Sequence, residues 1–269
     1  TEPLLPALRP FAATEVLTQA SLWLDVVVLG ALASPAAVGI YGVARGLTRV
    51  LDLVRQASAH GYLPSASTAI ARGEAGHLPA LHVGTRRFAF ALVWPVLAVC
   101  LLAPEPLLTL LFGGSYAGAA TALRLLALGS FVTSAFDYLD LLLVADRKPG
   151  EVLRAGVAGA LALLALLAGL VPALGGPGAA LALLGGGLVR GLLLHRAFFR
   201  ALPFAPFRPA LVEPLLLGGL SLLGGALLLA LLRPEGIAAL LCAGAAGAFG
   251  SGAALVLFFR ARDGGGAVA

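Results

Sequence analysis

Residues 152–171 read VLRAGVAGALALLALLAGLV, a run in which Arg154 is the only charged side chain. Breaker residues close the run at both ends, with Lys148-Pro149-Gly150 before it and Gly175-Gly176-Pro177 after it. About 20 apolar residues are what an α-helix needs to cross the hydrocarbon core of a bilayer. The stretch therefore predicts a membrane-spanning helix, and similar runs recur along the rest of the chain.

The composition of the whole chain points to the same class of protein. Its 269 residues are 60% hydrophobic and 12% charged, whereas a soluble domain carries about 25% charged residues. The mean hydropathy is +1.00. Such a chain has too little polar surface to face water on all sides, which excludes an ordinary soluble fold. Cys100 and Cys242 lie inside apolar runs and are expected to be buried, inert thiols, and neither a metal nor a cofactor is expected.

Pro and Gly separate the apolar runs at regular intervals. The runs predict an all-α, polytopic membrane bundle of about eight transmembrane helices. The spans are expected near residues 11–33, 36–71, 87–103, 117–145, 152–171, 178–199, 211–232 and 237–259.

Basic residues gather in every second connection between these spans. The basic set contains Arg9; Arg72, Arg86 and Arg87; Arg147, Lys148 and Arg154; Arg196, Arg200 and Arg208; and Arg260 and Arg262. The alternate connections carry almost no basic residues; they are Ser34-Pro35, the Glu105 loop, residues 175–177 and the turn with Arg233. The positive-inside rule then places both termini in the cytoplasm, in an inner or plasma membrane. The net charge of +5 follows from this topology, and nucleic acid is not an expected partner.

The second predicted span carries an unusual stripe of charge. Arg45, Arg49, Asp52 and Arg55 are spaced i, i+4, i+7 and i+10, which places them on one side of a helix at about 100° per residue. Because a charge facing lipid costs a few kcal/mol, the stripe should face the bundle interior or a wet cavity. Asp52 could pair with Arg49 and Arg55, but net positive charge would remain. The stripe therefore favours a cavity that handles an anionic group.

Other spans carry acidic residues. Asp25 in the first span is either a partner for an arginine of the second span or a proton or sodium site. Asp137 and Asp140 in the fourth span are three residues apart and share a face. Two carboxylates can bind a cation or take part in proton coupling, or they can be counter-ions to the arginines. Asp25, Asp52, Asp137 and Asp140 are thus candidates for ion coupling or for charge compensation, and both interpretations stay open.

The sixth predicted span is rich in glycine around one charge. Arg190 lies between Gly187 and Gly191, whose small-xxx-small spacing permits close helix contact. Nothing in the chain resembles a nucleophile elbow, a phosphate-binding Gly-Lys-Ser/Thr loop or a metal-binding His-Glu pair. The notable charges lie within helices rather than at the membrane interface. The sequence therefore predicts a translocation path and not an enzyme.

Short motifs occur in one order along the chain: LWLDVVVLG at 22–30, VGIYGVA at 38–44, LFGGSYAGA at 111–119, LVADRK at 143–148 and GGPGAALA at 175–182. Together they resemble the C-terminal portion of an oligosaccharide flippase, of the polysaccharide-export branch of the multidrug/oligosaccharidyl-lipid/polysaccharide transporter superfamily. Asp146 stands where that family more often has glycine.

The resemblance implies an architecture of two six-helix lobes around a central cavity, to which some members add two C-terminal helices. Residues 1–202 would then be the second lobe and 203–269 the added pair. The chain begins at Thr1 and contains no Met, so we expect a fragment of a longer transporter whose N-terminal lobe is its partner.

The resemblance also implies a substrate, an isoprenoid-pyrophosphate-linked oligosaccharide that is flipped by alternating access for surface polysaccharide synthesis. A polysaccharide polymerase or glycosyltransferases are partners of such a system. Guanidinium groups recognise phosphate oxygens well, so the role of binding pyrophosphate falls on Arg45, Arg49 and Arg55.

Two other functions compete with this one. A cation-coupled multidrug exporter of the same superfamily would depend on acidic residues such as Asp25 or Asp137 and would tolerate loss of the arginines. A non-transporting scaffold of a polysaccharide synthase complex would use its Arg–Asp pairs only to hold helices together.

Overall fold

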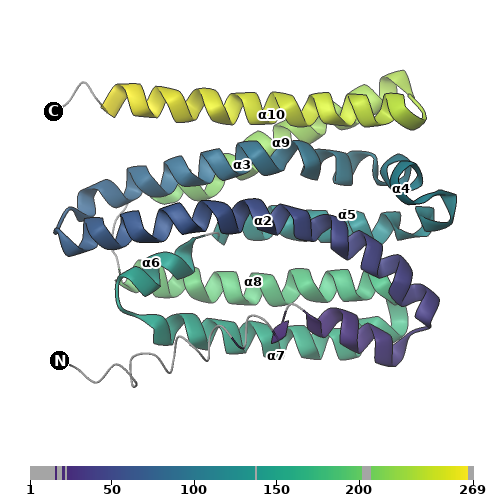
Figure 1. The fold of residues 1–269 in the computed structure, drawn as a ribbon, viewed down its shortest axis with the longest axis horizontal. Helices are drawn as coiled ribbons and strands as arrows, with labels where there is room; N and C mark the ends of the chain where they lie inside the picture. The colour runs from purple at the N-terminus through teal and green to yellow at the C-terminus, as the bar shows by residue number, and fades with distance from the viewer. Residues whose placement is uncertain (1–15, 17–19, 22, 137, 202–206, 266–269) are drawn as a thin grey trace.

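The structure, a computed structural model, describes residues 16, 20–21, 23–136, 138–201 and 207–265. Every element in these ranges is a helix, which confirms the all-α prediction, and Figure 1 shows the long helices running lengthwise beside one another. The α-helices are Trp23–Leu32 at the N-terminal side, α2 Pro35–Ala71, α3 Leu78–Leu102, α4 Pro104–Phe112, α5 Ala120–Thr133, α6 Leu139–Ala145, α7 Pro149–Leu174, α8 Gly176–Ala201, α9 Phe207–Leu232 and α10 Gly236–Gly265. Short 3-10 turns are η1 Ala75–His77, η2 Gly114–Ala119 and η3 Ser134–Phe136.

Six stretches of the described chain are long and apolar enough to cross a membrane, which indicates a multi-pass membrane protein. They are Leu78–Leu102, Gly114–Ala145, Pro149–Leu174, Gly176–Arg200, Leu215–Leu232 and Gly236–Leu257. The first expected span lies partly outside the described residues. The second is α2, which is 37 residues long and carries the charged stripe. The expected total of about eight therefore stays a prediction.

Helix ends follow the breaker residues of the sequence. α2 begins at Pro35, and the hydroxyl of Ser34 accepts a hydrogen bond from the N–H of Ala37 at 3.3 Å. α7 begins at Pro149. Proline fits the first turn of a helix because its missing N–H would be unpaired there, and a serine before it caps the exposed N–H groups. Gly175, with φ of 59°, turns the chain between α7 and α8, a conformation that suits glycine.

The structure corrects three of the expected boundaries. α3 begins at Leu78 and not near residue 87, so Arg86 and Arg87 lie within the helix and not in a basic loop. The expected Glu105 loop contains the helix α4. The fourth span is broken between α5 and α6, where Tyr138 has a left-handed φ of 65°. At the start of α3, hydropathy is lowered by Arg86 and Arg87, although both find partners on other elements.

The long helices pack in layers around α2 and α3. α7 and α8 lie side by side on one flank, and α9 and α10 lie along α3 on the other (Figure 1). The turns at 72–77 and 146–148 lie at the same end as the C-terminal ends of α8 and α10, whereas the turns at 175 and 233–235 lie at the opposite end. The turns that carry Arg72, Arg147 and Lys148 thus share one end of the bundle. Which side of a membrane that end faces stays a prediction.

Specific polar contacts hold α9 and α10 against α3. The indole N–H of Trp94 donates to the hydroxyl of Ser221 at 3.1 Å, and that hydroxyl donates to the carbonyl of Ala246 at 2.5 Å. Gly247 lies against Pro95, where a side chain would not fit. The last two helices therefore attach mainly to α3, with smaller contacts to α4 and η3. The proposed division at residue 202 stays a prediction.

Candidate functional site

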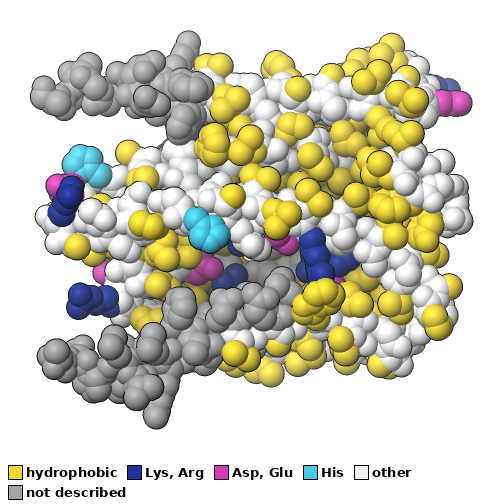
Figure 2. Space-filling view, viewed as in Figure 1, with side chains coloured by type: hydrophobic (Ala, Val, Ile, Leu, Met, Phe, Trp, Pro, Cys, Tyr) yellow, Lys and Arg dark blue, Asp and Glu magenta, His cyan; other side chains and the backbone are white. Residues whose placement is uncertain are grey.

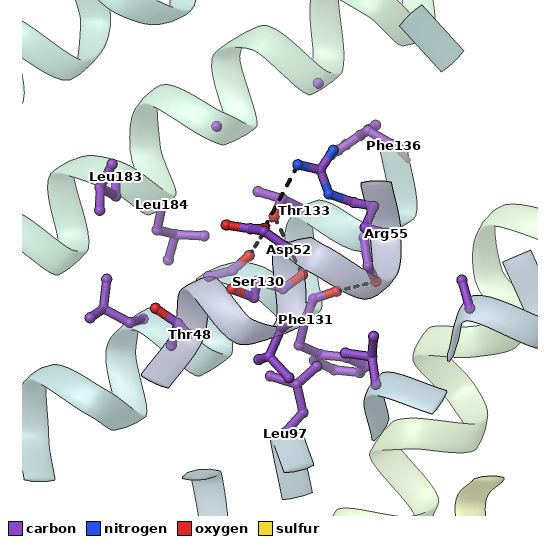
Figure 3. Close-up of a pocket in the computed structure, with 18 of the residues that line it drawn as sticks. Thr48, Asp52, Arg55, Leu97, Ser130, Phe131, Thr133, Phe136, Leu183 and Leu184 are labelled. Carbon is purple, nitrogen blue, oxygen red and sulfur yellow. Dashed lines mark hydrogen bonds and ion pairs between the residues drawn. The ribbon is translucent and has the colours of Figure 1, made fainter. Parts of the chain in front are cut away.

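A cavity of about 280 Å³ lies between α2, α3, α5, α6 and α8. Its ionisable side chains and hydroxyl groups come from Arg45, Thr48, Asp52, Arg55, Arg86, Ser130, Thr133, Ser134, Tyr138, Asp140 and Arg190. Figure 3 shows Thr48, Asp52, Ser130 and Thr133 gathered beside the apolar side chains of Leu183 and Leu184. Figure 2 shows charged side chains in a hollow beside α2, on a face that is otherwise mostly hydrophobic.

Arg45 is anchored at the edge of this cavity by a buried carboxylate. Its Nε donates to Oδ2 of Asp25 at 3.0 Å, and the hydroxyl of Tyr41 donates to the same oxygen at 2.6 Å. Asp25 is 0% exposed and Tyr41 is buried. The expected pairing of Asp25 with an arginine of the second span is thus confirmed. Arg45 uses Nε for this bond, and among the described residues no side chain accepts from its Nη1 or Nη2.

The three arginines of α2 do not share one surface. Arg55 lines the cavity and pairs with Asp52 at 3.7 Å (Figure 3). Arg49 instead lies over the ring of Trp23, with 3.9 Å from its Cζ to the ring centroid, and it is not among the residues that line the cavity. At about 100° per residue, Arg49 and Arg55 point about 120° apart around the helix axis. The four charged residues therefore spread too far around the helix to line one cavity. Arg49 was expected to face the cavity, but it contacts Trp23 of the N-terminal helix instead.

Arg190 occupies the opposite wall of the cavity. Its Nη2 donates to Oδ2 of Asp140 at 2.8 Å, which joins α8 to α6. The glycines on either side of it let α8 come close to the end of α5 and to η3: a Cβ on Gly187 would lie 2.9 Å from Cγ2 of Thr133, and one on Gly191 would overlap the ring of Phe136. The close helix contact predicted for these glycines is confirmed. The described ion pair of Asp140 is with α8, not with the arginine stripe of α2.

Arg86 is a cavity residue that the sequence analysis assigned to a loop. It is 4% exposed, and its Nη2 donates to the carbonyl of Ser134 at 2.9 Å, at the break in the fourth span. The signal was present in the sequence, because Arg86 precedes Phe90 and Trp94 at intervals of four, which places the three residues on one helix face. Asp137, the remaining acidic candidate, lies outside the described residues.

The cavity therefore combines positive charge with hydroxyl donors inside an apolar bundle. Among the residues that line it, four arginines from α2, α3 and α8 accompany two aspartates. The part of the chain that the structure describes holds no group of three or more His, Cys, Asp or Glu side chains able to bind a metal ion. Such an arrangement can hold an anion by charge-assisted hydrogen bonds.

Comparisons with protein-family models and with curated proteins found no match to this chain. The geometry of the cavity is therefore the observation from which function is argued.

Proposed function

We propose that the chain forms part of a membrane transporter that flips an isoprenoid-pyrophosphate-linked oligosaccharide across the cell membrane by alternating access, for surface polysaccharide synthesis. The observation that supports this is the convergence of Arg45, Arg55, Arg86 and Arg190 on one cavity among apolar helices. Guanidinium groups match the geometry of phosphate oxygens. Electrostatic attraction is also stronger in a low-dielectric interior than in water.

The size of the cavity suits a headgroup and not a whole lipid-linked sugar. A volume of about 280 Å³ lies just below the range of about 300–1,000 Å³ for small-ligand pockets. A diphosphate is small enough for such a cavity, and the sugar and isoprenoid chains would extend beyond it toward the membrane and the proposed N-terminal lobe. In this proposal Arg45 and Arg190 contact the pyrophosphate from opposite walls, and Arg55, whose side chain is 42% exposed, meets it on entry. Arg49 has no role in binding.

A charge-neutral double variant tests this function. Asp140→Asn combined with Arg190→Gln removes a cation from the cavity without leaving an unpaired charge. In proteoliposomes that contain the complete purified protein, flipping of a fluorescent lipid-linked oligosaccharide should fall at least about tenfold, as expected for loss of a charge-assisted bond. The matched control is Glu151→Gln with Arg154→Gln, which removes the pair at 2.8 Å on the exposed start of α7 and should leave flipping unchanged.

A scaffold is the second candidate, because the Asp25–Arg45 and Asp140–Arg190 pairs each join two helices. A scaffold would not move lipid on its own. If the correctly folded wild-type protein fails to flip the lipid-linked oligosaccharide, the transport proposal is wrong. If the Asp140→Asn/Arg190→Gln variant flips at the wild-type rate, the assignment of the cavity is wrong.

A further inference from the structure

The two close arginine–aspartate pairs at the cavity differ in how far they are enclosed. The side chains of Arg45 and Asp25 are 12% and 0% exposed, and Asp25 is not among the residues that line the cavity. The side chains of Arg190 and Asp140 are 34% and 25% exposed, and both residues line it. An anion that enters the cavity therefore reaches both members of the second pair directly.

The carboxylate of Asp140 has a second hydrogen bond that does not depend on the arginine. Its Oδ2 accepts from Nη2 of Arg190 at 2.8 Å, whereas its Oδ1 accepts from the N–H of Leu141 at 2.9 Å. That N–H lies in the first turn of α6, where N–H groups have no partner within the helix. If Arg190 exchanged partners, Asp140 would remain hydrogen-bonded at the edge of a cavity. This costs less than leaving a fully enclosed carboxylate without any partner.

The break in the fourth span separates Asp140 from α5. Tyr138 has a left-handed φ of 65°, and Arg86 holds the carbonyl of Ser134 in η3, before the break. After the break, Leu142 and the other buried leucines of α6 fix that helix in the core of the bundle. A shift of the Asp140 side chain away from α8 therefore disturbs neither of these anchors.

We infer that Asp140 is a built-in competitor for the anion: it occupies Arg190 in the empty cavity and gives it up when a pyrophosphate binds. This inference rests on the proposed function, from which it takes the pyrophosphate. The carboxylate and the incoming diphosphate draw on the charge of one guanidinium group and repel each other, and this repulsion is stronger in a low-dielectric interior than in water. Asp140 thereby lowers the affinity of the cavity for the headgroup. Passage across a membrane needs binding that is weak enough for release.

Asp52 offers a matched comparison within the same cavity. Among the described residues that line the cavity, it is the other carboxylate. It pairs with Arg55 on its own helix at 3.7 Å, and the two side chains are 33% and 42% exposed. A pair of this length and exposure is weak. Neutralising Asp52 therefore removes the same charge from the cavity without releasing a tightly bound arginine.

Binding of inorganic pyrophosphate to the complete purified protein tests the competition. The dissociation constant is measured calorimetrically at constant pH and ionic strength. Asp140→Asn should lower this constant at least about tenfold, because the pyrophosphate no longer has to displace a carboxylate from Arg190. Asp52→Asn should lower it by no more than about threefold.

A purely structural role for the pair predicts the opposite sign. If Asp140 only positions Arg190, Asp140→Asn weakens pyrophosphate binding, and that result overturns the inference. Thermal unfolding gives a second measurement. Asp140→Asn should melt at a lower temperature than the wild type when empty, and the same concentration of pyrophosphate should raise its melting temperature by more. An equal or smaller rise contradicts the competition.

If Asp140→Asn does not fold, Asp140→Ser takes its place, since a serine hydroxyl can still accept from the N–H of Leu141. The two levels of proposal fail differently. If neither the wild-type protein nor the Asp140 variant binds pyrophosphate, the proposed function and the competition fall together. If the wild type binds it and the Asp140 variant binds it no more tightly than Asp52→Asn does, the competition alone is overturned.

Discussion

Arg87 on α3 holds both carboxylate oxygens of Glu213 on α9, with Nε to Oε1 and Nη2 to Oε2 each at 2.8 Å. The remaining nitrogen, Nη1, donates to the carbonyl of Leu257 on α10 at 2.8 Å. The two side chains are 15% and 19% exposed. One guanidinium group thus joins three apolar helices, and its fork geometry suits this bidentate contact.

Arg87→Ala should destabilise the bundle because it leaves the largely buried carboxylate of Glu213 without its counter-ion. We expect the free energy of unfolding to fall by about 3 kcal/mol, measured by thermal and denaturant unfolding in detergent. Arg154→Ala is the control, since its pair with Glu151 has side chains that are 79% and 42% exposed and should contribute less than about 1 kcal/mol. Equal effects of the two substitutions would show that the Arg87 pair is solvated.

The two arginines one turn apart on α2 should differ in function. Arg45→Gln removes a charge from the cavity while keeping a donor for Asp25, so flipping should fall at least about tenfold. Arg49→Gln removes the contact with Trp23, which is worth about 1 kcal/mol or less at an exposed site, and flipping should stay within about twofold. Transport rates in proteoliposomes check this. The reverse order of effects would place the substrate on the Arg49 side of the helix.

The glycine beside Arg190 should tolerate no side chain. A Cβ at Gly191 would lie 2.5 Å from Cγ and 2.8 Å from Cε2 of Phe136, which lines the cavity. Gly191→Ala should therefore displace that ring, lower stability by about 1–3 kcal/mol and slow flipping. Gly169→Ala, in α7, meets nothing within 4 Å and should be neutral. Comparing melting temperatures and transport rates of the two variants tests the expectation, which fails if both behave alike.

The orientation of the bundle can be tested at two turns. Glu74 lies in the turn after α2 and Glu235 in the turn before α10, at opposite ends of the bundle (Figure 1). In a background with Cys100 and Cys242 replaced by alanine, a membrane-impermeant thiol reagent added to intact cells should label Glu235→Cys and not Glu74→Cys. Labelling of Glu74→Cys alone would invert the topology, with both termini outside.

Hydropathy and breaker residues predicted most helices closely. The expected span 152–171 lies within α7, and 211–232 and 237–259 lie within α9 and α10. Helix boundaries were predicted less accurately where charged residues lie near the start of a helix or inside it. Arg86 and Arg87 were counted as loop residues because charge lowers local hydropathy, although both find partners on other helices.

The amino-acid sequence alone was enough to predict a helical membrane bundle and where most of its helices begin and end, and it offered an arginine partner as one of two interpretations of Asp25. These features follow from local properties, namely the length of apolar runs, the backbone limits of Pro and Gly, and the cost of an unpaired charge in lipid. The tertiary structure decided which charges share the cavity. Arg190 and Arg86 reach it from α8 and α3, and Arg49 does not, because helix rotation and the glycine contacts around Gly191 set where each side chain points. Such contacts join residues far apart in the chain, so a local pattern can indicate that a helix face is small or charged but not which other helix meets it.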